Sequence, residues 1–120
     1  MQYMILFNQE AKELERGRDD PSSADYWEAW RAYMTDIYAA GIVKSGNALQ
    51  PPFSATTLRI RDGKRQVHDG PFADTKEMLG GYLVIEVSSL DEALEWAARS
   101  PSSFTGSTEI RPVMTMNAGP

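Results

Sequence analysis

Two segments of this chain carry apolar side chains at both odd and even positions, and this pattern limits the folds that the chain can adopt. They are residues 1–8 (MQYMILFN) and residues 82–87 (YLVIEV). Such runs indicate β-strands, and successive side chains of a strand point to opposite faces of its sheet. A strand with one face in water would show a polar stripe. A further layer must therefore cover each face of the predicted sheet.

Two amphipathic helices supply one such layer. The first is expected over residues 23–40, where apolar side chains recur at helical spacing: Tyr26, Trp30, Tyr33 and Ile37. Ser22 or Ser23 offers the N-cap oxygen, and Gly41 offers the C-terminal stop. An aromatic row of this kind is more typical of a helix packed on a sheet than of a ligand site.

The second helix is expected to begin after Ser89, with Glu92 completing a capping box, and to end before Pro101. The remaining segments read as strands and turns. We expect a weak strand over 42–49, a hairpin of 55–61 and 65–68 joined by Asp62-Gly63, and a last strand over 109–116. Residues 8–21 are polar and are expected to form a loop, with at most a helical turn.

This order of elements predicts a single domain over residues 1–120 with a ferredoxin-like α+β fold and an antiparallel sheet. Two helices can cover only one face of that sheet. A second copy of the chain is the simplest source of a layer for the other face. We therefore expect a homodimer whose sheets face each other.

The segment between the hairpin and the strand at 82–87 has the most chemically varied residues, 69–77 (DGPFADTKE). One interpretation is structural: Asp69 accepts backbone N–H groups of the following turn, Gly70 and Pro71 shape that turn, and Phe72 fills one end of a barrel. The other interpretation is a site in a cleft between subunits.

In the second interpretation, Asp69 acts as a general base and Lys76 stabilises developing negative charge, with His68 as a further acid–base candidate. The candidate ligand-binding residues are Asp69, Phe72, Asp74, Lys76, Glu77 and Arg111. Several of these residues also have a purely structural interpretation. Lys76 with Glu77 can be a surface ion pair, Arg111 can form an exposed salt bridge, and His68 can be a surface residue.

Composition excludes several classes of site and partner. The chain has no cysteine and one histidine, so cysteine-ligated and histidine-rich metal sites are excluded, and we expect neither a metal nor another cofactor. A net charge of −5 argues against direct binding of nucleic acid. The basic cluster at 59–65 is interpreted as a solvated hairpin tip. No segment reaches the ~20 apolar residues of a membrane span, and we expect a cytoplasmic protein.

Residues 69–77 resemble the signature of the YCII-related, or DGPF, family. The segments 79–82 (LGGY), 90–97 (LDEALEWA) and 110–113 (IRPV) are similar to that family as well. The resemblance implies a dimeric α+β barrel of ferredoxin-like type and leaves the activity unassigned. Some members of the wider group have a proposed His-Asp catalytic pair. His68 is the only histidine here, so that pair does not transfer to this chain.

Two functions follow as expectations. One is the binding of a small organic ligand, with or without weak cofactor-free acid–base chemistry, in a cleft near the DGPF loop. The alternative is a non-enzymatic module that binds a protein partner, linked through that partner to transcription as the resemblance suggests. The exposed ends of the first helix, at Trp27 and Tyr38, are where such a partner is expected.

Overall fold

A four-stranded antiparallel sheet forms the body of the molecule. The computed structural model describes residues 1–71 and 75–115. The sheet has the strand order β2-β5-β1-β6, in which β1 spans Gln2–Glu10, β2 Val43–Ala48, β5 Glu77–Glu86 and β6 Ser107–Pro112. This is the ferredoxin-like order once the hairpin between β2 and β5 is set aside. The predicted fold class is confirmed.

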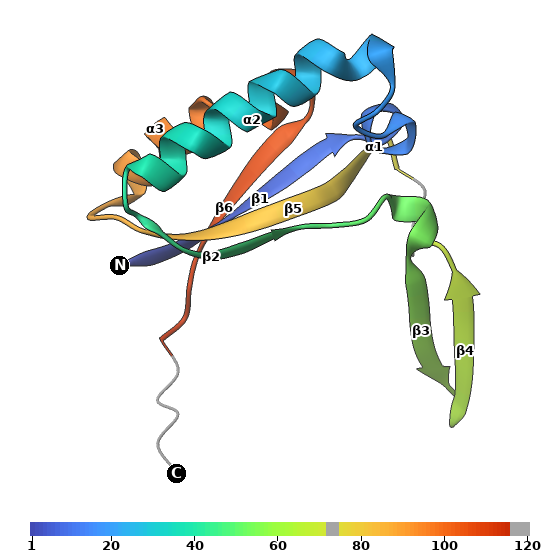
Figure 1. Cartoon of the computed structure of the whole chain (residues 1–120). Helices are drawn as coiled ribbons and strands as arrows, with labels where there is room; N and C mark the ends of the chain where they lie inside the picture. Colours follow the sequence, from blue (N-terminus) through green and yellow to red (C-terminus); the bar gives the residue numbers. More distant parts are fainter. Residues whose placement is uncertain (72–74, 116–120) are drawn as a thin grey trace.

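Helices α2 (Ala24–Ala39) and α3 (Leu90–Ala98) lie on the same face of this sheet (Figure 1). The core lies between them and the strands. It contains Tyr3, Ile5, Phe7, Trp30, Tyr33, Ile37, Leu83, Ile85, Val87 and Ala93. The interpretation of the aromatic row of α2 as core packing is therefore confirmed for Trp30 and Tyr33. No helix in the described part of the chain is long and apolar enough to cross a membrane.

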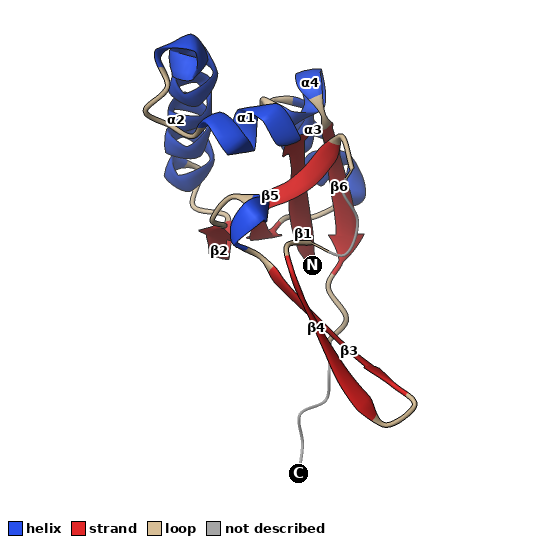
Figure 2. Cartoon of the chain, turned by 90° about the vertical axis from the view of Figure 1, so that its right-hand side faces the viewer, coloured by secondary structure: helices blue, strands red, loops and turns tan. Residues whose placement is uncertain are grey.

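Strands β3 (Thr56–Arg61) and β4 (Lys64–Asp69) form a separate two-stranded sheet. This hairpin, called the arm below, projects from the body of the molecule (Figures 1 and 2). The expected Asp62-Gly63 turn is confirmed, because both residues have positive φ, 53° and 73°. A 3₁₀ turn (Pro52–Ser54) precedes the arm.

The N-terminal connection is more ordered than the sequence suggested. Helix α1 (Ala11–Arg16) follows β1 directly, and Leu14 is buried on it. A short 3₁₀ turn (Pro21–Ser23) then leads into α2. The predicted serine cap of α2 is wrong. Ser23 is the N-cap residue, but its side chain accepts no hydrogen bond from the helix, because its backbone (φ −107°, ψ 8°) lies outside the extended conformation of a capping residue. Its hydroxyl donates to Glu13 Oε2 at 2.9 Å instead.

The cap of α3 is confirmed, since Ser89 Oγ accepts a hydrogen bond from the Glu92 amide at 3.2 Å. Gly41 also ends α2 as expected, with a φ of +74°. A short helix, α4 (Ser102–Thr105), was not predicted. Strand β5 begins at Glu77, five positions before the predicted start, so Gly80 and Gly81 lie inside a strand.

Candidate functional site

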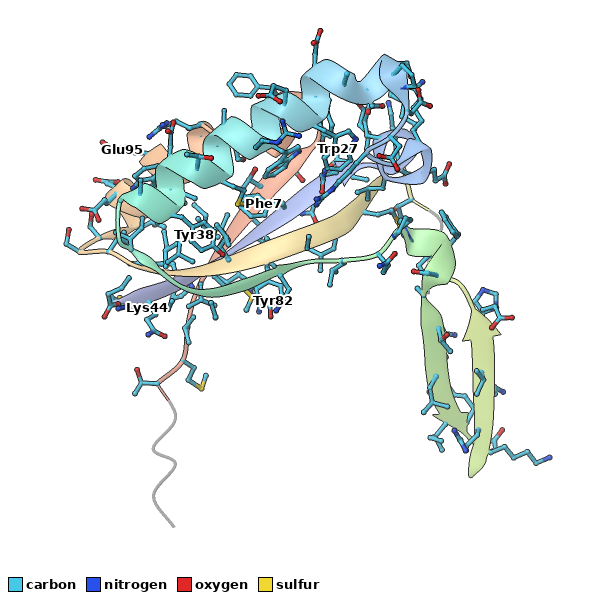
Figure 3. All side chains as sticks on the ribbon, in the orientation of Figure 1. Phe7, Trp27, Tyr38, Lys44, Tyr82 and Glu95 are labelled. Carbon is cyan, nitrogen blue, oxygen red and sulfur yellow. The ribbon has the colours of Figure 1, made fainter. Side chains whose placement is uncertain are left out.

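A groove of about 1140 Å³ runs between α2 and the edge of the sheet formed by β2 and β5. One wall comes from α2, the floor from the helix-facing side of the strands, and the loop after α1 closes one end. The lining includes Phe7, Gln9, Leu14, Gly17, Arg18, Asp19, Trp27, Trp30, Arg31, Met34, Thr35, Tyr38, Gly46, Ala48, Gly80, Gly81 and Leu83. In Figure 3, Trp27 and Tyr38 lie on the side of α2 that faces the sheet, and Tyr82 lies on the other side of the sheet.

Three glycines at the floor of the groove allow neighbouring atoms to pack closely against the strands. A Cβ atom at Gly46 would lie 2.4 Å from Leu83 Cδ2, and one at Gly81 would lie 2.9 Å from the Asn47 carbonyl oxygen. At Gly80 it would lie 1.8 Å from Gln9 Oε1. The β1–β5 register shifts at this point, between Phe7 and Asn8. The strands therefore approach each other more closely here than side chains would allow.

The aromatic wall is held in place by hydrogen bonds to its surroundings. Tyr26 accepts a hydrogen bond on its hydroxyl from Gln9 Nε2 at 2.8 Å, which ties the start of α2 to β1. Trp27 donates from Nε1 to the Gly17 carbonyl at 3.2 Å, which ties α2 to the loop after α1. The Arg18 guanidinium lies 5.2 Å from the centre of a Trp27 ring, within cation–π range.

One polar atom at this wall has no partner. The indole Nε1 of Trp30 is buried and makes no hydrogen bond within the described residues. An unpaired buried donor costs about 1–3 kcal/mol. Trp30 lines the groove, but its Nε1 atom is not exposed to it.

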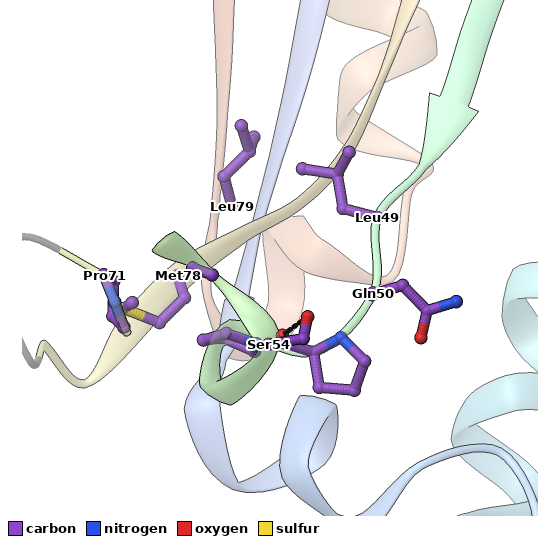
Figure 4. A pocket seen from close by; sticks show the side chains of 9 residues that line it. Leu49, Gln50, Ser54, Pro71, Met78 and Leu79 are labelled. Carbon is purple, nitrogen blue, oxygen red and sulfur yellow. Dashed lines mark hydrogen bonds between the residues drawn. The ribbon is translucent and has the colours of Figure 1, made fainter. Parts of the chain in front are cut away.

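A second, smaller hollow of about 350 Å³ lies at the base of the arm (Figure 4). Its lining is mostly apolar and includes Leu49, Pro51, Pro52, Pro71, Met78 and Leu79. Pro71 belongs to the DGPF segment. The hollow is therefore the described cavity nearest to the site that the sequence suggested.

The structure divides the predicted site residues that it describes between the arm and the body of the molecule. His68 and Asp69 are exposed on β4 of the arm, opposite Thr57 and Thr56 respectively. As neighbours on a strand they point to opposite faces of the hairpin. Phe72 and Asp74 lie outside the described residues.

The other predicted residues belong to the body of the molecule. Lys76 accepts a backbone hydrogen bond from the Ala11 amide at 2.8 Å, and Glu77 Oε1 accepts one from Ser107 Oγ at 2.7 Å. Arg111 forms an exposed ion pair with Glu109, with Nε and Oε2 3.6 Å apart. None of the predicted residues that the structure describes lines the groove. Their catalytic and binding roles stay predictions.

The groove was not predicted from the sequence. The signals were present in the glycines at positions 46, 80 and 81 and in two aromatic residues of α2 outside its buried row, Trp27 and Tyr38. Within the described residues, no group of three or more acidic or histidine side chains is arranged to hold a metal ion.

Comparisons with known proteins agree with the architecture. The family model for the YCII-related domain matches residues 1–117. An uncharacterized protein, R00369, from Rhizobium meliloti (strain 1021) is 45% identical over 73 residues, which is 59% of this chain and 59% of the relative. The chain thus matches about three-fifths of that relative's length.

A solved structure is also similar in fold. It is 5-chloro-2-hydroxyhydroquinone dehydrochlorinase (TftG) from Burkholderia phenoliruptrix AC1100, in complex with 2,5-dihydroxybenzoquinone. The TM-score is 0.53 at 20% identity, and the match covers 95% of this chain and 94% of the other. At this identity the likeness supports the fold, and it is consistent with the ferredoxin-like strand order described above.

Proposed function

Because the chain belongs to the YCII-related domain family, we propose that it binds a small aromatic organic molecule in the groove between α2 and strands β2 and β5. The observation that carries this proposal is the groove itself. Its volume of about 1140 Å³ slightly exceeds the range of about 300–1,000 Å³ that is typical of small-molecule sites. Three of the residues that line it are glycines, at positions 46, 80 and 81.

The character of the walls favours a flat ligand. Trp27, Trp30 and Tyr38 line one side and Phe7 lies at the floor. Aromatic rings stack on one another or meet edge to face, and both arrangements select planar apolar groups. The structure of the dehydrochlorinase in complex with 2,5-dihydroxybenzoquinone supports a ligand of this general class.

The polar groups at the groove favour a ligand with oxygen acceptors. Arg18 and Arg31 are among the residues that line it. A hydroxyl, carbonyl or carboxylate group would accept hydrogen bonds from these donors. The lining includes Asp19, whose carboxylate is the acid–base group that a cofactor-free reaction in the groove would use. The sites proposed for Asp69, His68 and Lys76 near the DGPF loop would act on a ligand held outside this groove.

The alternative function, a non-enzymatic module for a protein partner, would use exposed apolar surface instead. Tyr38 is 53% exposed at the end of α2, and Phe53 is 70% exposed before the arm. Phe53 does not line the groove, and it would remain accessible when the groove is filled. Blocking the groove therefore separates the two functions.

The test is a binding titration with two probes, 2,5-dihydroxybenzoquinone and the fluorescent dye 8-anilinonaphthalene-1-sulfonate. The variant Ala48→Trp places an indole over Gly81, its partner in the β2–β5 register, and fills the groove. Ala29→Trp adds the same side chain to the exposed face of α2 and serves as the matched control.

We expect saturable binding of at least one probe to the natural chain and to Ala29→Trp, and a loss of about tenfold or more in affinity for Ala48→Trp, since the added indole occupies the site. Equal affinity for all three proteins would overturn the assignment of the groove. Saturable binding to none of them would do the same.

A further inference from the structure

Gln9 carries a buried amide side chain on β1, and the residue is 4% exposed. Its Nε2 donates to the Tyr26 hydroxyl at 2.8 Å, whereas its Oε1 makes no hydrogen bond within the described residues. A buried amide oxygen has two lone pairs and normally accepts at least one hydrogen bond. Gln9 Oε1 is therefore an acceptor that lacks a donor.

This oxygen is open to a molecule bound in the groove. Among the described residues, Trp30 Nε1 is the one unpaired polar atom of a covered side chain that is completely enclosed. Gln9 Oε1 is unpaired as well, but it is not enclosed in this way, and Gln9 lines the groove. The surface that the oxygen retains therefore gives a bound molecule access to it.

A β-bulge makes the space for the amide. The β1–β5 register shifts between Phe7 and Asn8, and the shift leaves Gly80 without a counterpart on β1. A Cβ atom at Gly80 would lie 1.8 Å from Gln9 Oε1, so the amide oxygen fills the volume that a side chain at position 80 would need. Bulges are common next to active sites, where they redirect a side chain. This bulge lets Gln9 extend its amide over β5.

The surroundings of the unpaired oxygen are apolar. Leu14 Cδ2 would lie 3.1 Å from the same Cβ position, so Leu14 and the Gln9 amide lie together over Gly80. Leu14 is 6% exposed and Phe7 is 2% exposed, and both line the groove. A hydrogen bond is stronger in such surroundings than in water, and an unpaired acceptor is costly there. The oxygen therefore discriminates between a ligand that donates a hydrogen bond and one that does not.

The amide lies next to the aromatic wall of the groove. Tyr26 binds the amide nitrogen. Its ring meets those of Trp27 and Trp30 edge to face, at centroid distances of 5.1 and 6.4 Å. Trp27 and Trp30 both line the groove. A planar ligand that packs against these indole rings has the Gln9 amide beside it.

We propose that Gln9 is a specificity-determining residue of the groove: its Oε1 accepts a hydrogen bond from a hydroxyl group on the ring of the bound molecule. This inference rests on the proposed function and narrows it to aromatic alcohols. A carbonyl, a carboxylate or an ether at this position has no proton to donate. A hydroxyl is favoured over an amino group because its oxygen can also accept from the arginines of the groove, Arg18 and Arg31.

Two naphthalenes that differ in this donor test the proposal: 2-naphthol and its methyl ether, 2-methoxynaphthalene. Both are flat, fluorescent and uncharged at neutral pH. Their dissociation constants are measured by fluorescence titration for the natural chain and for two variants. Gln9→Met removes the acceptor and keeps a side chain of similar length. Gln2→Met makes the same substitution at an exposed position of the same strand and is the matched control.

We expect the natural chain and Gln2→Met to bind 2-naphthol at least about tenfold more tightly than 2-methoxynaphthalene. In Gln9→Met the ratio of the two dissociation constants should fall to about two or less, because neither ligand then meets the acceptor. Loss of the bond to Tyr26 weakens the binding of both ligands and leaves their ratio unchanged. A preference caused by the bulk of the methyl group would persist in Gln9→Met. Such persistence, or a ratio near one in the natural chain, would overturn the proposal.

The same titrations separate this inference from the proposed function. Equal affinity of the two naphthalenes for the natural chain, lost in Ala48→Trp, would keep the groove as a ligand site and reject the role of Gln9. Saturable binding of 8-anilinonaphthalene-1-sulfonate without binding of either naphthalene would do the same. The absence of saturable binding for every probe would overturn both.

A second measurement uses the natural chain alone and needs no folded variant. A hydrogen bond accepted by Oε1 polarises the amide group and moves the Nε2 proton signals downfield in a nitrogen–proton correlation spectrum. We expect saturating 2-naphthol to move the Gln9 signals downfield by more than 2-methoxynaphthalene does, while the Gln2 signals stay fixed. Equal shifts of the Gln9 signals with the two ligands would contradict the proposal.

Discussion

Gly80 lies so close to Gln9 that a Cβ atom at position 80 would come within 1.8 Å of the Gln9 side-chain oxygen. Gln9 is itself 4% exposed and donates from Nε2 to the Tyr26 hydroxyl. The glycine thus allows β1 to carry a buried polar side chain that reaches α2. This arrangement fixes the floor and the far wall of the groove relative to each other.

Gly80→Ala should destabilise the fold by about 1–3 kcal/mol, the usual range for inserting an atom into a packed site. The added methyl group would displace the Gln9 amide and break its bond to Tyr26. The free energy of unfolding from urea denaturation measures this effect. In the Gln9→Ala background the same substitution should cost less, because the clashing atom is gone. Equal costs in the two backgrounds would contradict the contact.

Phe7→Ala should be among the most destabilising single substitutions, at about 3–5 kcal/mol. Phe7 is 2% exposed, and its ring meets Trp30 and Tyr33 edge to face at centroid distances of 4.9 and 6.0 Å. Chemical denaturation of the variant and of the natural chain measures this change in the free energy of unfolding. Phe104, which is 78% exposed, supplies the control, and Phe104→Ala should change stability by less than about 0.5 kcal/mol.

Ser89→Ala should lower stability by about 1 kcal/mol through loss of the α3 cap. Ser89→Asp should retain most of it, since a carboxylate accepts the Glu92 amide bond and suits a helix N-terminus. Thermal unfolding of the two variants at one pH provides the comparison. If Ser89→Ala and Ser89→Asp lowered the stability equally, the loss would have a cause other than the missing cap.

Stability should fall as the pH rises above about 10, the ordinary pKa of tyrosine. Burial raises the pKa of Tyr33, whose hydroxyl donates to the Trp96 carbonyl at 3.0 Å. Above the ordinary pKa the unfolded chain releases this proton while the folded chain keeps it, so deprotonation favours unfolding.

The free energy of unfolding between neutral and alkaline pH measures this dependence. Tyr33→Phe should reduce the loss of stability at alkaline pH. Tyr38→Phe changes a residue that is 53% exposed and should not alter this loss. If the free energy of unfolding depended on alkaline pH in the same way in Tyr33→Phe as in the natural chain, groups other than Tyr33 would cause the loss of stability.

Most of the fold could be predicted because its signals are local. The period-3.6 row on α2, the Asp62-Gly63 turn and the Ser89 cap each depend on a few neighbouring residues, and each is present in the structure. The errors occurred where tertiary contacts decide. Leu14 stabilises α1 by packing near Gly80, and Ser23 bonds to Glu13 rather than to its own helix.

The groove was harder to predict for the same reason. A glycine pair before a strand reads as a turn, and Gly80-Gly81 became part of β5 because β1 pairs with it through a register shift. The varied residues of the DGPF segment suggested a site at Asp69 and Lys76. The position of a cavity, however, depends on how distant segments pack together, and the local sequence does not show this. In this chain the groove lies between α2 and strands β2 and β5.

The most direct test of the groove as a ligand site uses the three tryptophans of the chain. Trp27 and Trp30 line the groove, whereas Trp96 lies on α3 with Arg99 over its ring. Their indole N–H signals in a nitrogen–proton correlation spectrum can be assigned with single Trp→Phe variants and followed during a titration with 2,5-dihydroxybenzoquinone. We predict saturable shifts of the Trp27 and Trp30 signals with the Trp96 signal unchanged. Fixed Trp27 and Trp30 signals, or a shift of Trp96 alone, would contradict the account.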